Sequence, residues 1–322
     1  MGGHVMDDRH ALSRAFVVLN PMAGNCTAQD VRQALERHFS TDAWMCEIYE
    51  TTGEEQVAEV VRDTVKQDCA LVIAVGGDGT VSDVAEALVG SGIPLGIIPV
   101  GTANVFAHEL GLPFDLEGAC ALLADDHATT EIDAMQVGDK LYILHIGIGI
   151  DSLMIRDTER RAKRRFGRAA YIWTAFTRLI GYQPRRFTII VDGQRARPHA
   201  AQVLIANGGV LGVQPFRWGP HIRPDDGRID VCIVSARTLF DYLWVGWHLL
   251  IGRQQRHPNI RYLSAERSIV VSADRPLPVQ ADGEIIGETP VRVQVVPAAV
   301  RVIVPAANVD SPRRAEADLV SV

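Results

Sequence analysis

Apolar and polar residues follow two different rhythms along the chain. Over the first 133 residues, short apolar runs at 15–20 (AFVVLN), 70–75 (ALVIAV) and 95–100 (LGIIPV) alternate with stretches whose apolar residues share one helical face. Runs that are apolar on both faces are typical of central strands in a parallel sheet. The stretches between them, whose apolar residues share one helical face, predict amphipathic helices. We therefore expect residues 1–133 to form an α/β domain with a doubly wound parallel sheet.

The helix after the first strand has a clear start signal. Thr27 and Asp30 have the spacing of a capping box, and the apolar residues that follow fall on one face. Further elements of the same alternation are a strand at 46–50, a helix at 54–67, and helices after residues 80 and 104.

Near Ile132 the rhythm changes to strand-like segments separated by Asp-Gly and Gly-Gly turns. This pattern predicts a mainly antiparallel β-sandwich over residues 134–302, interrupted by helical insertions at 153–180 and 238–252. The tail, about residues 303–322, either frays or returns to the first domain. The strand-like segments are 131–137, 140–150, 186–194, 200–209, 228–235, 268–274, 291–297 and 300–305.

Composition narrows the class of protein. The 322 residues are 47% hydrophobic and 22% charged, which is ordinary for a soluble globular protein. The formal net charge of -7 argues against general nucleic-acid binding, so no nucleic-acid partner is expected. The five scattered cysteines show no metal-binding spacing, the first residues do not have the pattern of a signal peptide, and no apolar run reaches about 18 residues. We expect a cytoplasmic protein with reduced thiols.

A glycine-rich loop follows the strand at 70–75. Gly76, Gly77 and Gly79 would let backbone amides approach an anion, and the helix that begins near Val81 would add its positive end. Within the loop, Asp78 would reach Mg²⁺ or hold a ribose or an amide. The alternative is a tight strand-to-helix turn with cap residues.

Two more polar loops, 20–25 (NPMAGN) and 99–104 (PVGTAN), also follow buried strands. The ends of parallel strands face the ligand crevice of an open sheet, so three such loops would line one crevice. The loops fit neither a Walker A motif nor a dinucleotide fingerprint.

Taken in order, LNPMAG, VGGDGTVSDV and LGIIPVGTANVFA resemble the diacylglycerol kinase-type lipid kinases, a group that also holds the sphingosine kinases and bacterial lipid kinases. The likeness continues through GIGIDS, KRRFGRAAY, IANGG, RPDDGRIDV, HPNI and QADGEIIGETP, and so covers about residues 15–305. The GGDGT motif alone is shared with NAD kinases, whereas GTAN after LGIIPV and the late DGE separate the lipid kinases from them.

This resemblance implies an ATP site. Ser82-Asp83 stand where the family usually has Asn-Glu, and Val105 replaces an acid expected to face the site and its Mg²⁺. Thr51 is an alternative to Thr52 in the threonine position. The implied ATP contacts are Asn20, Pro21, Met22, Ala23, Gly24, Thr52, Gly76, Gly77, Asp78, Gly79, Thr80, Val81, Ser82, Asp83, Gly101, Thr102 and Asn104.

The family's Asp-Gly-Glu motif corresponds to Asp282, Gly283 and Glu284. The resemblance assigns Glu284 as the base that takes the proton of the lipid hydroxyl, with Asp282 near the Mg²⁺. An alcohol that attacks a γ-phosphoryl group needs such an acceptor and a metal ion. The alternative is a hairpin turn of the kind also predicted at 192–193 and 226–227.

A second, structural Mg²⁺ is implied at RPDDGRID. Its ligands would be the carboxylate of Asp226 and backbone carbonyls near Arg223 and Arg228, and oxygen-only ligation suits this ion. The alternative is an ordinary loop.

The resemblance implies a lipid substrate, with diacylglycerol, sphingoid bases, phosphatidylglycerol and polyprenols all open. The basic and aromatic stretch 160–176 suggests peripheral contact with an anionic membrane surface at the inner face of the membrane, unless it is a solvated helix face. Stretch 238–252 is expected to pack in the core or line the acyl-chain cleft. The oligomeric state stays open, and a homodimer is one alternative.

The function expected from all this is an ATP-dependent lipid kinase. The alternatives are an NAD kinase and a non-catalytic nucleotide- or lipid-sensing protein, the latter because of Val105.

Overall fold

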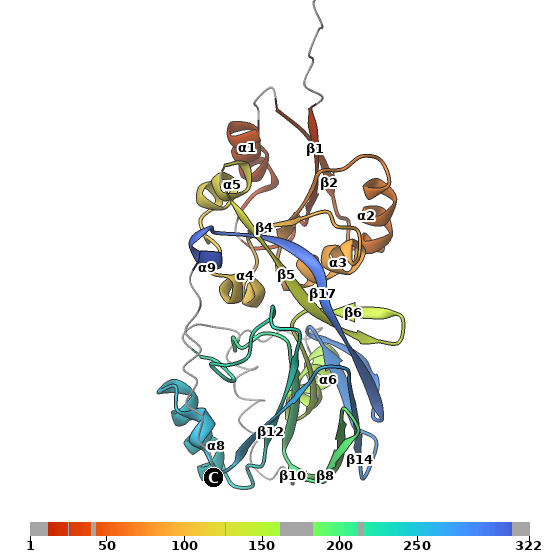
Figure 1. Ribbon diagram of the computed structural model, residues 1–322, viewed down its shortest axis with the longest axis vertical. Helices are drawn as coiled ribbons and strands as arrows, with labels where there is room; N and C mark the ends of the chain where they lie inside the picture. The colour runs from red at the N-terminus through yellow and green to blue at the C-terminus, as the bar shows by residue number, and fades with distance from the viewer. Residues whose placement is uncertain are drawn as a thin grey trace, which may run out of the picture.

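A computed structural model describes residues 12–24, 26–39, 43–125, 127–161, 183–211 and 216–310 of the chain. It has an upper part built on a parallel sheet and a lower part built from antiparallel strands (Figure 1). The basic stretch 160–176 lies almost entirely outside the described residues, so the membrane contact expected of it stays a prediction.

The upper part contains four parallel strands in the spatial order β4-β3-β1-β2. Every residue of β3 and β4 is buried, because helices cover both faces of the sheet. The bounds are β1 Ser13–Leu19, β2 Trp44–Glu50, β3 Leu71–Gly76 and β4 Leu95–Pro99.

Helices α1 and α5 cover one face of this sheet, and α2 and α3 cover the other (Figure 1). Alternate residues of one strand serve the two cores: in β1, Val17 packs toward α1 and α5, whereas Phe16 and Val18 pack toward α2 and α3. The bounds are α1 Ala28–Phe39, α2 Val57–Val65, α3 Asp78–Leu88, α4 Val105–Leu110 and α5 Leu116–Ala124.

Local signals place the start of α1 where the sequence predicts it. The Asp30 amide donates to Thr27 Oγ1 at 3.1 Å, and the Thr27 amide donates to Asp30 Oδ2 at 3.0 Å. The predicted capping box is thus confirmed.

The lower part is a sandwich of two mainly antiparallel sheets. One sheet has the order β13-β12-β11-β7-β15-β16, and the other contains β8, β14 and the first part of β17. Apolar residues of both sheets share one core. The bounds are β5 Ala128–Val137, β6 Lys140–Tyr142, β7 His145–Gly149, β8 Arg185–Val191, β9 Gln194–Ala196, β10 His199–Ala200, β11 Gln202–Ala206, β12 Ile229–Val234, β13 Ile260–Ala265, β14 Ser268–Ala273, β15 Pro278–Ala281, β16 Glu284–Glu288 and β17 Val291–Val304.

The two parts share strands rather than a single linker. β5 and β17 pair with each other along most of their length, and β17 also reaches β4, where Val302 pairs with Leu95. Beyond β17, the short helix α9 (Ala307–Asp310) places Asn308 against α4, where its Nδ2 donates to the Leu110 carbonyl at 2.8 Å. The expected architecture, a doubly wound parallel sheet followed by an antiparallel sandwich, is confirmed.

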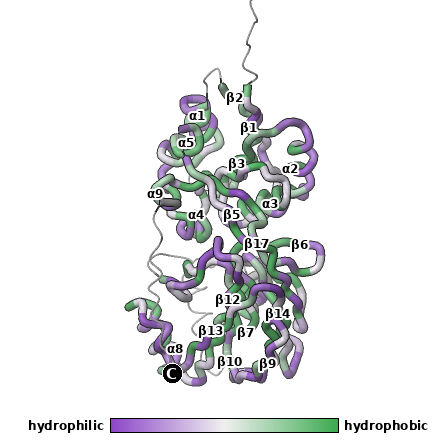
Figure 2. Tube along the Cα trace, in the orientation of Figure 1, coloured by the Kyte–Doolittle hydropathy of each residue, from purple (hydrophilic) through white to green (hydrophobic). Residues whose placement is uncertain are grey.

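Within the described residues the lower part has the longer helices α6 (Ile150–Arg161) and α8 (Leu239–Leu250), and a 3-10 turn follows α8 at Gln254–Arg256. The expectation that stretch 238–252 packs in the core or lines a cleft is only half right. Val245 and Leu249 are buried, but most large apolar side chains of α8 face solvent. Figure 2 shows apolar residues along the central strands and mixed colouring on the helices that cover them. Among the described residues, no helix combines the length and hydropathy needed to cross a bilayer.

Candidate functional site

The sheet changes its winding direction between β1 and β3, because β2 lies beyond β1 and β4 lies beyond β3. The loops after β1 and β3 therefore open side by side, at the place where α/β sheets bind ligands. The Asn20 amide donates to the Val75 carbonyl at 3.0 Å, and Asn20 Nδ2 donates to Thr80 Oγ1 at 3.3 Å. The first predicted loop, residues 20–24, is thus attached to the second.

Glycines stand where the three loops touch. A Cβ on Gly24, whose φ is +68°, would lie 1.5 Å from the Val100 carbonyl oxygen. One on Gly101 would lie 2.5 Å from the Cα of Gly77. No other residue type fits these two close approaches without moving backbone. The structure therefore brings the loops around residues 20–24, 76–80 and 100–104 together.

The start of α3 faces this junction of loops. Its N-cap residue is Gly77, which has no side chain to satisfy the amides of the first turn. Thr80 and Ser82 are buried, and Gly79 has open space around the position of a Cβ. Uncapped amides at the positive end of an eleven-residue helix are suited to an anion.

The Asp78 carboxylate, for which the sequence offered Mg²⁺, a ribose or an amide as partners, binds a backbone amide. Its Oδ1 accepts from the Phe106 amide at 3.1 Å and so fixes the first turn of α4. Asn104, with φ +46°, precedes that helix and donates from Nδ2 to the Gly101 carbonyl at 2.9 Å. Its Oδ1 is buried and has no hydrogen-bond partner among the described residues, so it could accept from a ligand.

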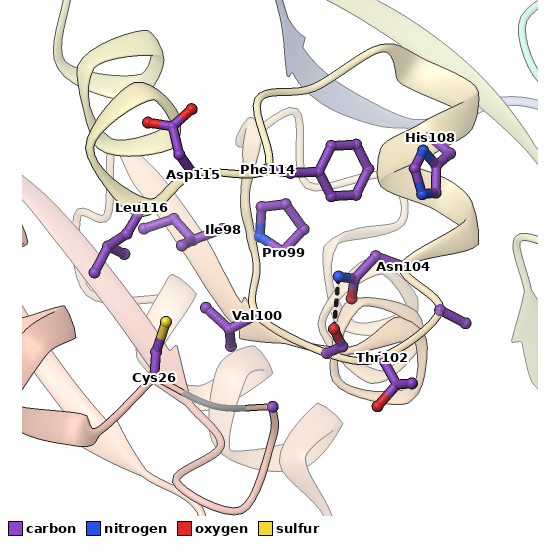
Figure 3. Close-up of a pocket in the computed structure, with 13 residues that line it drawn as sticks. Cys26, Ile98, Pro99, Val100, Thr102, Asn104, His108, Phe114, Asp115 and Leu116 are labelled. Carbon is purple, nitrogen blue, oxygen red and sulfur yellow. Dashed lines mark hydrogen bonds between the residues drawn. The ribbon is translucent and has the colours of Figure 1, made fainter. Parts of the chain in front are cut away.

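A cavity of about 670 Å³ lies between the GTAN loop, the loop at Gly24 and the start of α5 (Figure 3). Its volume is in the range of small-molecule sites. Four predicted ATP contacts line it, namely Gly24, Gly101, Thr102 and Asn104. His108 and Phe114 also line it, with ring centroids 4.0 Å apart (Figure 3).

Other predicted ATP contacts have local roles. Thr52 bonds to Glu55 through its amide, at 2.7 Å, and through its hydroxyl, and these bonds hold the pKa of Glu55 down at about 2. Val81 packs in the core beneath α3. Val105, where the resemblance implies an acid, packs partly buried against the same core. Pro21, Met22 and Ala23 form the turn of the first loop.

The Asp-Gly-Glu hairpin between β15 and β16 meets α3 directly. Ser82 Oγ donates to Asp282 Oδ2 at 2.6 Å, although the residues are 200 positions apart. The same carboxylate accepts from the amides of Ile143, Leu144 and His145 at 3.0 to 3.3 Å. Asp282 thus joins the hairpin to the upper part of the molecule, and its neighbour in the turn, Glu284, stays exposed.

Acidic side chains gather beside this contact. The Asp83 side chain keeps solvent-accessible area, but surrounding protein atoms restrict its hydration, and Glu284, Glu86 and Asp282 repel its charge. Together these effects raise the pKa of Asp83 to about 6, with Lys140 acting in the opposite direction. The pKa of Tyr142 rises to about 12 through burial and the same carboxylates.

The pKa of Asp83 should depend on the negative charge of Glu284. We expect a midpoint near 6 in carboxyl carbon-13 NMR, and a lower midpoint in Glu284→Gln because a repelling charge is gone. Since the folded-state pKa is raised, the free energy of unfolding contributed by Asp83 should fall as pH rises from 3.8 to about 6. Asp83→Asn should remove that fall. An unchanged midpoint in Glu284→Gln, with Glu288→Gln as the control, would show that the two acids do not interact.

The second predicted metal site lies at the bulge of β17. Asp226 Oδ1 accepts from the Arg228 amide at 3.0 Å, and Arg223 forms a two-bond ion pair with Asp225. Restricted hydration and neighbouring aspartates raise the pKa of Asp226 to about 6. The segment is thus a hydrogen-bonded turn, and the structural Mg²⁺ stays a prediction.

Asp133, which the sequence reasoning did not single out, organises this region. It is buried and accepts from the Gly227 amide at 2.7 Å and the Ala298 amide at 2.9 Å. Asn207 Nδ2 donates to the Asp133 carbonyl at 2.7 Å and to the Ile143 carbonyl at 2.8 Å. The sequence feature that could have pointed to Asp133 is an acid in the middle of an apolar strand, because a buried carboxylate requires partners.

The donors at the hairpin fit Mg²⁺, which takes one or two carboxylates together with phosphate oxygens. Within the described ranges, no three His, Cys, Asp or Glu side chains are grouped closely enough to hold a metal alone. The negative charges of Asp83 and Glu284 repel each other, and a cation that also binds phosphate would relieve this repulsion.

Comparisons with known families agree across both parts of the chain. The sequence model of the diacylglycerol kinase catalytic domain matches residues 14–137. That of the YegS C-terminal NAD kinase beta sandwich-like domain matches residues 145–304.

Individual relatives cover most of the chain. An uncharacterized protein of Synechocystis sp. is 30% identical over 307 residues, which are 91% of this chain and 70% of that protein. A diacylglycerol kinase of Mycobacterium tuberculosis is 28% identical over 92% of this chain and 97% of its own length. A diacylglycerol kinase of Staphylococcus haemolyticus is 29% identical over 284 residues, which are 86% of this chain and 83% of that protein. A crystal structure of a Bacillus anthracis diacylglycerol kinase superposes with a TM-score of 0.73 at 24% identity, over 92% of this chain and 98% of that one, which supports the fold.

Proposed function

Because this chain belongs to the diacylglycerol kinase-type family of lipid kinases, we propose that it transfers the γ-phosphoryl group of ATP to a lipid hydroxyl. Diacylglycerol or a related lipid is the proposed acceptor. The observation that carries the proposal is the 2.6 Å contact between Ser82 and Asp282, since it sets an acidic hairpin beside the glycine loops.

The glycine loops would bind the phosphates. The amides at the start of α3 have no side-chain cap, and the open space at the Cβ position of Gly79 leaves room for a phosphate to approach them closely. Asn20 and Thr80, already bonded to each other, offer polar groups to the same anion. Bound Mg²⁺ would neutralise charge on the phosphates and would be held by the phosphate oxygens together with Asp83, which leaves Glu284 free to act as a base.

Glu284 would accept the proton of the attacking lipid hydroxyl. It is exposed at the first residue of β16, so a substrate can reach it. Asp282 would act as a positioning residue, because four hydrogen bonds already occupy its carboxylate and fix the turn that presents Glu284. Protein groups with fixed directions lose little freedom on reaching the transition state.

A lipid acceptor resides in a bilayer, so the protein would act at a membrane surface. The proposal places it as a peripheral protein at the inner face of the membrane, with ATP supplied from the cytoplasm.

Transfer of radiolabel from ATP to mixed lipid vesicles tests the proposed function. We expect a labelled lipid phosphate that depends on Mg²⁺ and on one lipid of a panel containing diacylglycerol, a sphingoid base, phosphatidylglycerol and a polyprenol. Labelled NADP after addition of NAD would instead identify an NAD kinase. ATP binding without any labelled product would identify a sensing protein, and either result would overturn the proposal.

A further inference from the structure

Helix α8 carries a continuous apolar face that no described element covers. Six of the ten large apolar side chains that are exposed in the described part of the chain belong to this helix and the residue after it. Their spacing of three and four positions places them on one side of the helix. They are 40 to 70% exposed: Phe240, Leu243, Trp244, Trp247, Leu250 and Ile251.

The opposite side fixes the helix to the sandwich. Val245 and Leu249 are buried with Ile260 of β13 in a small core of their own. A capping box between Thr238 and Asp241 sets the first turn. The exposed face is therefore a surface held in place, and exposed apolar surface of this extent marks an interaction site.

Arginines stand at both ends of this face. Arg237 precedes the helix, and Arg253 and Arg256 follow it; all three are exposed, and none forms an ion pair with a described residue. Asp241, the one acid in the helix, is engaged in the capping box through the amides of Arg237 and Thr238. The apolar face is thus bordered by positive charge.

Two indoles lie within the face. Trp244 stacks on Phe240 with ring centroids 5.9 Å apart, and Trp247 follows on the same side. Tryptophan is favoured at the boundary between headgroups and acyl chains, and arginine is attracted by anionic headgroups. The twelve residues of α8 span about 18 Å, less than the roughly 30 Å of a hydrocarbon core, so the helix could only lie in the boundary.

We propose that the outer face of α8 inserts into the surface of an anionic bilayer and holds the protein there. The combination of an apolar stripe, paired indoles and a basic border fits a lipid surface better than a second protein. Figure 1 shows α8 at the end of the molecule away from the parallel sheet, so this contact is separate from the nucleotide loops. This contact would be the membrane contact of the proposed lipid kinase. The inference rests on the proposed function only because a lipid substrate requires the protein to bind a bilayer.

Vesicle sedimentation without nucleotide tests the inference independently of kinase activity. We expect binding to phosphatidylglycerol–phosphatidylcholine vesicles to weaken at least about tenfold in Trp244→Ser/Trp247→Ser. In Arg253→Gln/Arg256→Gln it should weaken about tenfold and become less dependent on salt, because Arg237 still carries positive charge at the border of the face. Met45→Ser, which changes an exposed apolar residue of β2, is the matched control and should bind like the wild type. All substituted side chains are exposed, so thermal unfolding should stay unchanged.

Equal vesicle binding by the wild type and both double variants would overturn the proposal. So would sedimentation equilibrium that shows a wild-type dimer and a monomeric Trp244→Ser/Trp247→Ser variant, because a second copy would then cover the face. Since binding is measured without ATP, an inactive enzyme that still binds vesicles would refute the proposed function and leave this inference standing.

Discussion

Replacing Glu284 with glutamine should lower the rate of lipid phosphorylation by about 10²- to 10⁴-fold, the range that general acid–base groups contribute. Glutamine has nearly the same shape but cannot take the proton of the attacking hydroxyl at neutral pH. The side chain is exposed and Asp282 keeps its four hydrogen bonds, so the fold should be preserved. Initial rates of radiolabel transfer and calorimetric ATP binding measure the two effects.

The matched control for this change is Glu288→Gln, because Glu288 is another exposed acid of the same short strand. It should keep nearly full turnover. Retained turnover in Glu284→Gln would show that another group takes the proton.

Gly101→Ala should push the loop at residues 100–104 away from Gly77 and reduce ATP affinity about fivefold or more. The added Cβ would lie 2.5 Å from the Gly77 Cα and 2.6 Å from Asn104 Oδ1, so backbone must move. Overpacking of this kind costs about 1–3 kcal/mol, and 1.4 kcal/mol corresponds to a tenfold change in affinity. Chemical denaturation and ATP calorimetry measure the loss of stability and of binding.

Gly79→Ala separates ligand contact from folding. Nothing lies within 4 Å of the added Cβ, and the residue is helical, so stability should stay level or rise by up to about 1 kcal/mol. ATP binding should nevertheless weaken, because the methyl group would stand where phosphate approaches α3. Normal ATP binding by Gly79→Ala would place the phosphates elsewhere.

Local patterns in the sequence were sufficient for the parallel sheet. The strand at 70–75 is apolar on both faces, and the loops that follow β1, β3 and β4 carry glycines where backbones touch. The capping box at Thr27 likewise depends on four adjacent residues. Each of these features is decided within a few positions, so periodicity and turn chemistry reveal it.

Contacts between distant segments could not be predicted in this way. Asp192 and Asp282 both precede glycine in a hairpin with positive φ, and each accepts from three consecutive backbone amides. Only Asp282 also meets Ser82 of α3, and that difference comes from the pairing of distant strands. Stretch 238–252 has apolar residues all around its helix, so its sequence does not indicate which side is buried.

The most direct test of the proposed function is a crystal structure with Mg²⁺ and a non-hydrolysable ATP analogue. The phosphates are expected against the amides of residues 77–80 and the backbone of Gly101, with the γ-phosphoryl group turned toward Glu284. A nucleotide bound away from these loops, or one whose γ-phosphoryl group points away from β16, would contradict the proposed function.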